Sequence, residues 1–111
     1  MQPSQAHSHA EKMLRSSQNR SREDPLWKAA EQQLLAAAIL HTKEQDGNFR
    51  SLLEVIKLSP TALEHCLKNS PCSAARVEFE NYKTNTTDNF RVGVQSGLIA
   101  QLQASWLNEW M

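Results

Sequence analysis

The stretch EDPLWKAAEQQLLAAAIL, residues 23–40, joins a helix start signal to seven residues without a polar side chain. Asp24 is a favourable N-cap residue, and Pro25 suits the first helical position, where the backbone N–H has no intrahelical partner. From Leu34 to Leu40 the apolar surface runs all the way round the predicted helix, which is typical of a helix enclosed by others. The stretch therefore predicts the central helix of a helical domain.

The rest of the chain predicts further helices joined by short loops. Its 111 residues include only 3 glycines, and no segment shows sustained alternation of apolar and polar residues. Predicted helices begin near residues 4, 24, 48, 59, 70 and 88. We expect an all-α fold, a compact bundle of about six helices with short loops, in which the second and last helices form the interior. One domain would span 1–111, with a lead helix and polar link over 1–23 and the main helical core over 24–111.

Local signals predict where individual helices begin and end. Gly47 is interpreted as the left-handed residue that ends the second helix. Ser59 and Ser70 each precede a proline, a pattern that predicts an N-cap followed by the first helical residue. The last helix carries two apolar lines, which predict that it is flanked on more than one side. These lines are Phe90, Val94, Leu98 and Leu102, and Val92, Ile99 and Trp106.

Composition limits the classes of function. Twelve basic residues balance twelve acidic ones, so any binding of nucleic acid would require a local patch. No stretch approaches the roughly 20 apolar residues that cross a bilayer, and the first residues do not resemble a signal peptide. We therefore expect a soluble, cytoplasmic chain without membrane contact. Cys66 and Cys72 are expected to be reduced thiols, because a disulfide between them would close only a short loop.

Motifs for chemistry are sparse. The segment Gly93–Gly97 (GVQSG) has Gln where a nucleophile elbow needs Ser, so we interpret its glycines as a helix crossing. His65, Cys66 and Cys72, with His41, form a candidate metal or small-enzyme site. Their spacing matches no common zinc pattern, and Cys66 falls on an apolar face, so a structural role is favoured. We expect no catalytic residue, no metal site and no cofactor in this chain.

Basic residues on the polar sides of the three short helices are the candidate binding residues. They are Arg50, Lys57, Lys68 and Arg76. Such residues often form only a solvated face, and the alternative is contact with a partner protein or with DNA phosphates. Of the tryptophans, Trp27 is assigned to packing, and Trp110 is the best candidate for contact with something outside this chain.

Four segments together resemble a known domain. They are AEKMLRSS (10–17), EDPLWKAAEQQLLAAAILH (23–41), FRSLLEVIKLSPTALEHCLKNSP (49–71) and GLIAQLQASWL (97–107). This pattern is similar to the all-alpha domain of conjugative coupling proteins, the TraG/TraD-like ATPases of type IV secretion systems. The resemblance extends from about Ala6 to Trp106.

The resemblance implies a function that the residues alone do not. In that family the domain is inserted in a RecA-like ATPase that is hexameric and anchored in the bacterial inner membrane. The all-alpha domain is expected to receive substrates: relaxase, relaxosome accessory proteins and DNA, single- or double-stranded. ATP and Mg²⁺ would belong to the parent protein, because this chain has neither a Walker A nor a Walker B motif. The fragment itself is expected to be a monomer without enzymatic activity.

One alternative of another class stays open. The chain would then be a stand-alone helical adaptor or regulator that binds proteins and has no nucleic-acid role.

Overall fold

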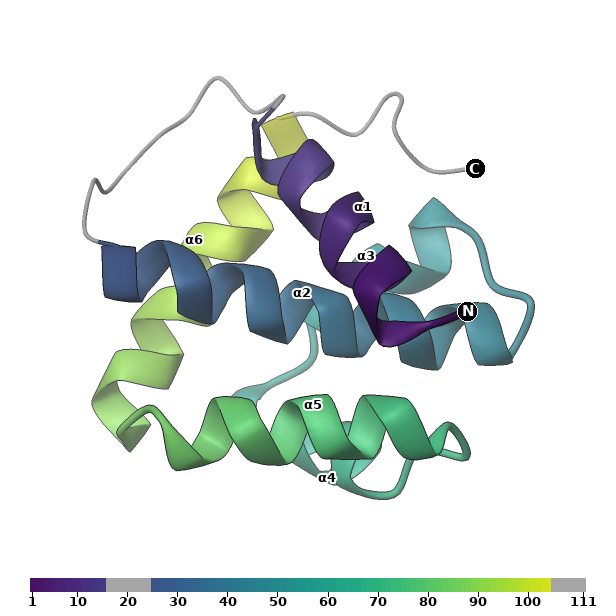
Figure 1. Ribbon diagram of the computed structural model, residues 1–111. Coiled ribbons are helices and arrows are strands. Elements are labelled where there is room, and N and C mark those ends of the chain that lie inside the picture. The colour runs from purple at the N-terminus through teal and green to yellow at the C-terminus, as the bar shows by residue number, and fades with distance from the viewer. Residues whose placement is uncertain (16–24, 105–111) are drawn as a thin grey trace.

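A computed structural model describes residues 1–15 and 25–104, which form helices and turns and contain no strand. The helices are α1 (Pro3–Arg15), α2 (Pro25–Glu44), α3 (Phe49–Ile56), α4 (Pro60–Lys68), α5 (Ser73–Thr84) and α6 (Asp88–Ala104). Figure 1 shows α2 crossing the middle of the molecule, with α1 over it, α5 beside it and α3, α4 and α6 around them. The predicted all-α bundle of about six helices is confirmed for the described residues.

The apolar run of α2 is the centre of the hydrophobic core. Every residue from Leu34 to Leu40 is 2 % exposed or less. Helix α2 packs most extensively against α1 and α5, and it also contacts α3, α4 and α6. A helix with neighbours on all sides has no face left for polar side chains, which explains the composition of the run.

Helix α1 packs onto this core through small residues. Ala6 and Ala10 are fully buried and Met13 is 2 % exposed, as their spacing predicts. Alanine side chains let two helix backbones approach closely, so α1 lies directly against α2. The predicted polar link that follows, and the Asp24 cap, lie outside the described residues.

The end of α2 differs from the prediction at Gly47. Asp46, and not Gly47, has the left-handed conformation, with φ of 55°. The Gly47 N–H bonds Thr42 O at 2.8 Å and the Asp46 N–H bonds Lys43 O at 3.1 Å, the two bonds of a Schellman motif. Aspartate tolerates this conformation. Glycine is required at 47 for space, because a Cβ there would lie 2.6 Å from Thr42 Cγ2.

The two Ser-Pro pairs have different outcomes. Ser59 caps α4 by accepting the Ala62 N–H at 3.2 Å, with Pro60 at the first helical position, as predicted. Ser70 does not cap α5, which begins after Cys72 without a side-chain cap. The Ser70 hydroxyl instead contacts His41 Nδ1 at 2.7 Å and accepts the Cys72 N–H at 3.1 Å. A buried tertiary contact thus replaces the local cap.

Helix α6 is only partly interior. Val94, Leu98 and Leu102 are fully buried as predicted, whereas Val92 on the second apolar line is 51 % exposed. Because that face meets solvent, α6 covers α2 from one side and α2 alone is central. Trp106, the end of the second line, lies outside the described residues.

The glycines of α6 mark the crossing with α2. An added Cβ at Gly93 would lie 2.8 Å from Trp27 Cη2, and one at Gly97 would lie 3.1 Å from Glu31 Oε2. The Trp27 ring is half-buried, donates from Nε1 to Glu31 Oε2 at 2.9 Å and meets Phe90 edge-on at 5.0 Å. The interpretation of GVQSG as a helix crossing is therefore confirmed.

Candidate functional site

The four predicted binding residues lie on three helices and are all exposed. Arg50 is in the first turn of α3 and Lys57 is its C-cap residue. A separation of seven residues returns to within about 20° of the same helix face, so these two cations form one line. Lys68 ends α4 and Arg76 lies in the first turns of α5.

Three of these cations remain available to a partner. Within residues 1–15 and 25–104, Arg50, Lys57 and Lys68 form no ion pair. Arg76 differs, because its guanidinium donates to the Ser70 carbonyl oxygen at the turn before α5. We therefore assign Arg76 to holding this turn and keep the other three as the exposed cation set.

Only some residues of the predicted cysteine and histidine cluster lie close together in the structure. His41 Nε2 lies 3.5 Å from Cys66 Sγ, and His41 Nδ1 contacts the Ser70 hydroxyl. His65 is exposed and contacts Asn69 on its own helix instead. Both cysteines are free thiols. The described residues contain no group of three or more side chains placed to hold a metal ion.

Electrostatics at this cluster oppose an activated thiol. Burial lowers the pKa of His41 and raises the pKa of the Cys66 thiol. Both shifts favour the neutral forms, whereas a nucleophilic cysteine needs its thiolate. What the geometry supports is a buried hydrogen-bonded cluster that joins α2 to the α4–α5 turn.

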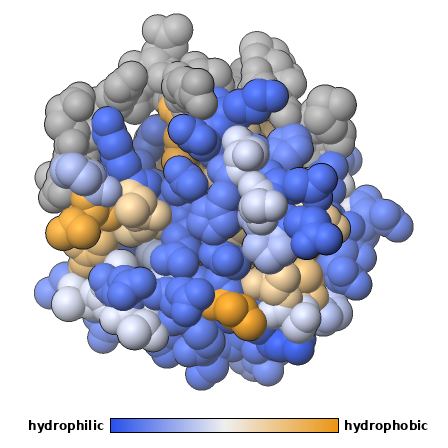
Figure 2. Space-filling view, viewed as in Figure 1, coloured by the Kyte–Doolittle hydropathy of each residue, from blue (hydrophilic) through white to orange (hydrophobic). Residues whose placement is uncertain are grey.

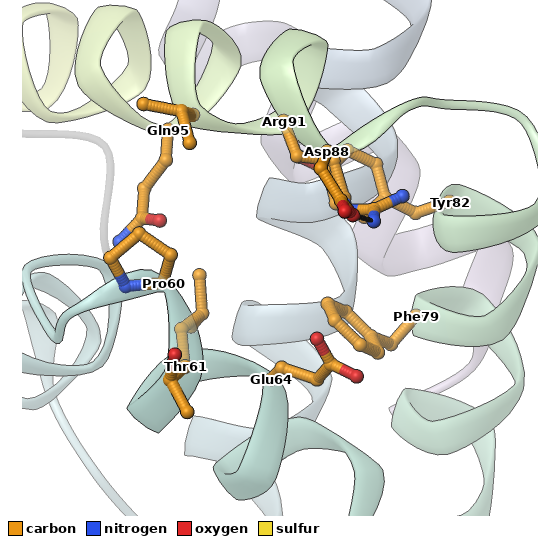
Figure 3. A pocket seen from close by; sticks show the side chains of 10 residues that line it. Pro60, Thr61, Glu64, Phe79, Tyr82, Asp88, Arg91 and Gln95 are labelled. Carbon is orange, nitrogen blue, oxygen red and sulfur yellow. Dashed lines mark hydrogen bonds and ion pairs between the residues drawn. The ribbon is translucent and has the colours of Figure 1, made fainter.

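A cleft lined by both polar and apolar side chains opens between α4, α5 and α6 (Figure 3). Its volume is about 260 Å³. Its lining residues are Pro60, Thr61, Leu63, Glu64, Phe79, Tyr82, Asp88, Arg91, Val92 and Gln95. No periodic pattern in the sequence predicts that these residues lie together, because they come from three separate helices.

Ion pairs frame this cleft. Lys83 Nζ donates to Glu64 Oε2 at 2.6 Å, and this bond is the main reason that the pKa of Glu64 lies below its ordinary value. Arg91 pairs with Asp88 and also donates from Nη1 to the carbonyl oxygens of Lys83 and Thr86 at 3.2 and 2.8 Å. Arg91 thereby caps the end of α5, and the Glu64 carboxylate stays ionised at neutral pH.

A second, apolar groove lies between the start of α2 and the turn from α5 to α6. Its volume is about 450 Å³ and it is lined by Leu26, Ala29, Ala30, Gln33, Asn85, Thr86, Thr87 and Phe90. Leu26 is 75 % exposed. Figure 2 shows a mostly hydrophilic face with a hydrophobic patch at its left edge, where Figure 1 places the start of α2.

None of the helices in the described part of the chain has the length and apolar character needed to cross a membrane. Comparison of the chain with protein-family models, curated proteins and solved structures finds no match.

Proposed function

We propose that this chain is the substrate-recognition domain of a coupling ATPase in a conjugative type IV secretion system. In this proposal it binds relaxase, relaxosome accessory proteins and DNA through the exposed cation set. The supporting observation is that Arg50, Lys57 and Lys68 are exposed and form no ion pair with the described residues. ATP and Mg²⁺ belong elsewhere in the parent protein.

Physical chemistry connects this surface with phosphates and acidic proteins. A cation that has no internal partner can pair with a phosphate or a carboxylate without first breaking an ion pair. Three such contacts give modest affinity, which agrees with a chain whose formal net charge is +0. The resemblance adds the identity of the partners. Trp27, the most distinctive residue of the segments that carry the resemblance, packs on α6 and therefore has a structural role.

Salt dependence of DNA binding tests the proposal. Fluorescence anisotropy with fluorescein-labelled single-stranded and duplex oligonucleotides would measure affinity over a range of NaCl concentrations. Contacts to three phosphates predict a slope of log K against log salt of about −2 on single strands and about −2.7 on duplex DNA. The triple reversal Arg50→Glu, Lys57→Glu and Lys68→Glu should abolish binding. Lys12→Glu, an exposed cation on α1, is the control and should change it little.

Binding of the chain to a purified conjugative relaxase, immobilised on a biosensor surface, would test the protein partner with the same triple reversal and the same Lys12→Glu control. The recognition role would be refuted if the chain bound neither DNA nor the relaxase. It would also be refuted if the triple reversal and Lys12→Glu reduced the binding affinity equally.

The apolar groove favours a second candidate function, an adaptor that binds only proteins. An exposed leucine beside a groove of this size suits an apolar side chain of a partner. Under this alternative Leu26→Asp abolishes partner binding while the triple reversal leaves it intact. Under the first proposal the triple reversal abolishes partner binding and Leu26→Asp leaves it intact.

A further inference from the structure

The cleft between α4, α5 and α6 has the size of a site for one small group. Its volume of about 260 Å³ lies just below the roughly 300–1,000 Å³ of pockets for drug-sized ligands. Phe79, 2 % exposed, contributes an apolar wall. The cleft therefore suits a single side chain or a molecule of similar size, and its hydrogen-bonding groups decide which chemistry it accepts.

Tyr82 is a buried polar residue on this cleft without an internal partner. The residue is 2 % exposed, and its hydroxyl makes no hydrogen bond to any described residue. Because no side-chain oxygen of the described residues is both buried and unpartnered, this hydroxyl is open to the cleft, where water or a ligand can bond it. Since Tyr82 lines the cleft, a ligand there could supply that partner.

Gln95 presents a free acceptor. The residue is 6 % exposed, and its Nε2 donates to Ile56 O at 2.8 Å and to Leu58 O at 2.6 Å. Both partners are carbonyl oxygens, so the orientation of the amide is fixed by chemistry and Oε1 is the remaining atom. That oxygen accepts no hydrogen bond from the described residues, and Figure 3 shows the amide among the side chains of the cleft.

The charged residues of the cleft also include a carboxylate oxygen that accepts no hydrogen bond from the described residues. Lys83 occupies Oε2 of Glu64, whereas Oε1 has no partner within residues 1–15 and 25–104. The Nη atoms of Arg91, by contrast, are already engaged by Asp88 and by the end of α5. The groups still available are mostly acceptors, which an anion cannot satisfy.

We propose that this cleft binds a guanidinium group. A guanidinium has five N–H donors, no acceptor and a flat face that suits an aromatic wall. Its donors match the acceptors at Gln95 Oε1, Glu64 Oε1 and the Tyr82 oxygen, and they spread over a plane, whereas an ammonium has only three donors around one point. The group would come from an arginine side chain of a partner protein or from free arginine. The proposal does not depend on the exposed cation set, because the two surfaces use different residues.

NMR titration of the ¹⁵N-labelled chain tests the proposal with three probes. N-acetyl-arginine-methylamide represents a partner's side chain, free arginine represents the small molecule, and N-acetyl-citrulline-methylamide is the neutral isostere. We expect saturable shifts of amides around the cleft at millimolar concentrations of at least one arginine probe, and none with citrulline. Preference for the capped probe assigns a protein partner, and preference for free arginine assigns the small molecule. Absence of saturable shifts, or equal binding of citrulline, overturns the proposal.

Conservative variants locate the site. Glu64→Gln should weaken binding roughly tenfold or more, because it removes a charge-assisted hydrogen bond. Tyr82→Phe should weaken it a few-fold while preserving the ring. Glu80→Gln, an exposed carboxylate of α5 outside the cleft, is the matched control and should bind as the parent does. Unchanged affinity in Glu64→Gln, with its fold verified by circular dichroism, overturns the proposal.

Discussion

The contact between Gly93 and Trp27 predicts that alanine at position 93 destabilises the domain. Helix propensity alone predicts the opposite, since alanine is favoured over glycine in a helix by about 1 kcal/mol. The new Cβ, however, would lie 2.8 Å from Trp27 Cη2. Trp27 cannot tilt away freely, because Glu31 accepts its N–H and Phe90 packs against it in an edge-on arrangement. Overpacking of this kind costs about 1–3 kcal/mol, so a net loss of about 1 kcal/mol is expected.

Urea denaturation followed by circular dichroism would measure the change in the free energy of unfolding. Ser96→Ala is the matched control, because Ser96 lies on the exposed face of the same helix. There the gain in propensity has no steric cost, and stabilisation of about 0.5 kcal/mol is expected. The two substitutions should therefore have opposite signs.

A double-mutant cycle identifies the ring as the cause. In a Trp27→Leu background the steric conflict disappears, and Gly93→Ala should become stabilising by up to about 1 kcal/mol. The reasoning is refuted if Gly93→Ala stabilises the parent protein as much as Ser96→Ala does. It is also refuted if the effect of Gly93→Ala is the same with and without the tryptophan.

Three further substitutions test other contacts by the same denaturation assay. Ser59→Ala removes the cap of α4 and should cost about 1 kcal/mol; an unchanged midpoint would contradict the capping role. Tyr82→Phe should leave the free energy of unfolding unchanged or raise it, because the hydroxyl has no partner among the described residues; a loss above about 1 kcal/mol would show a hidden partner. Burial lowers the pKa of His41, so the folded state takes up a proton less readily than the unfolded state. The contribution of neutral His41 is therefore complete above the unfolded pKa of about 6.5 and declines as the pH falls below it. His41→Gln should lose less stability than the parent between about pH 7.5 and about pH 5.5, and equal losses would refute this assignment.

The sequence predicted the helices well because the signal for them is local and periodic. Apolar residues three and four positions apart identify a buried face before any neighbour is known, and Ala6, Leu34 and Leu98 are all fully buried as expected. The failures occur where a distant residue competes with a local signal. Ser70 has the sequence of an N-cap, but His41 lies 29 positions earlier and takes its hydroxyl.

The candidate sites were predictable to different degrees. Exposure of Arg50, Lys57 and Lys68 follows from their places on polar helix faces. The bond from Arg76 to the Ser70 carbonyl oxygen depends on the turn before α5, which no helix pattern describes. The guanidinium cleft was missed because its acceptors come from three helices. One signal was present: Gln95 is a polar residue three positions after Val92 and four before Ile99, on the second apolar line.

The position of the apolar run in the core also constrains where any function can lie. Leu34 to Leu40 contact only other parts of the protein, so ligands must meet the outer helices or the first turns of α2. The two proposed surfaces meet on α4, where Lys68 belongs to the exposed cation set and also lowers the pKa of Glu64, after the larger effect of Lys83. Reversal of Lys68 therefore affects both surfaces. Reversal of Arg50 alone affects only the first, because Arg50 lies in the first turn of α3, whereas Lys57 lies between Ile56 and Leu58, whose carbonyl oxygens hold Gln95. A reversal of Arg50 that weakens DNA binding and leaves arginine binding unchanged would establish that the surfaces act independently.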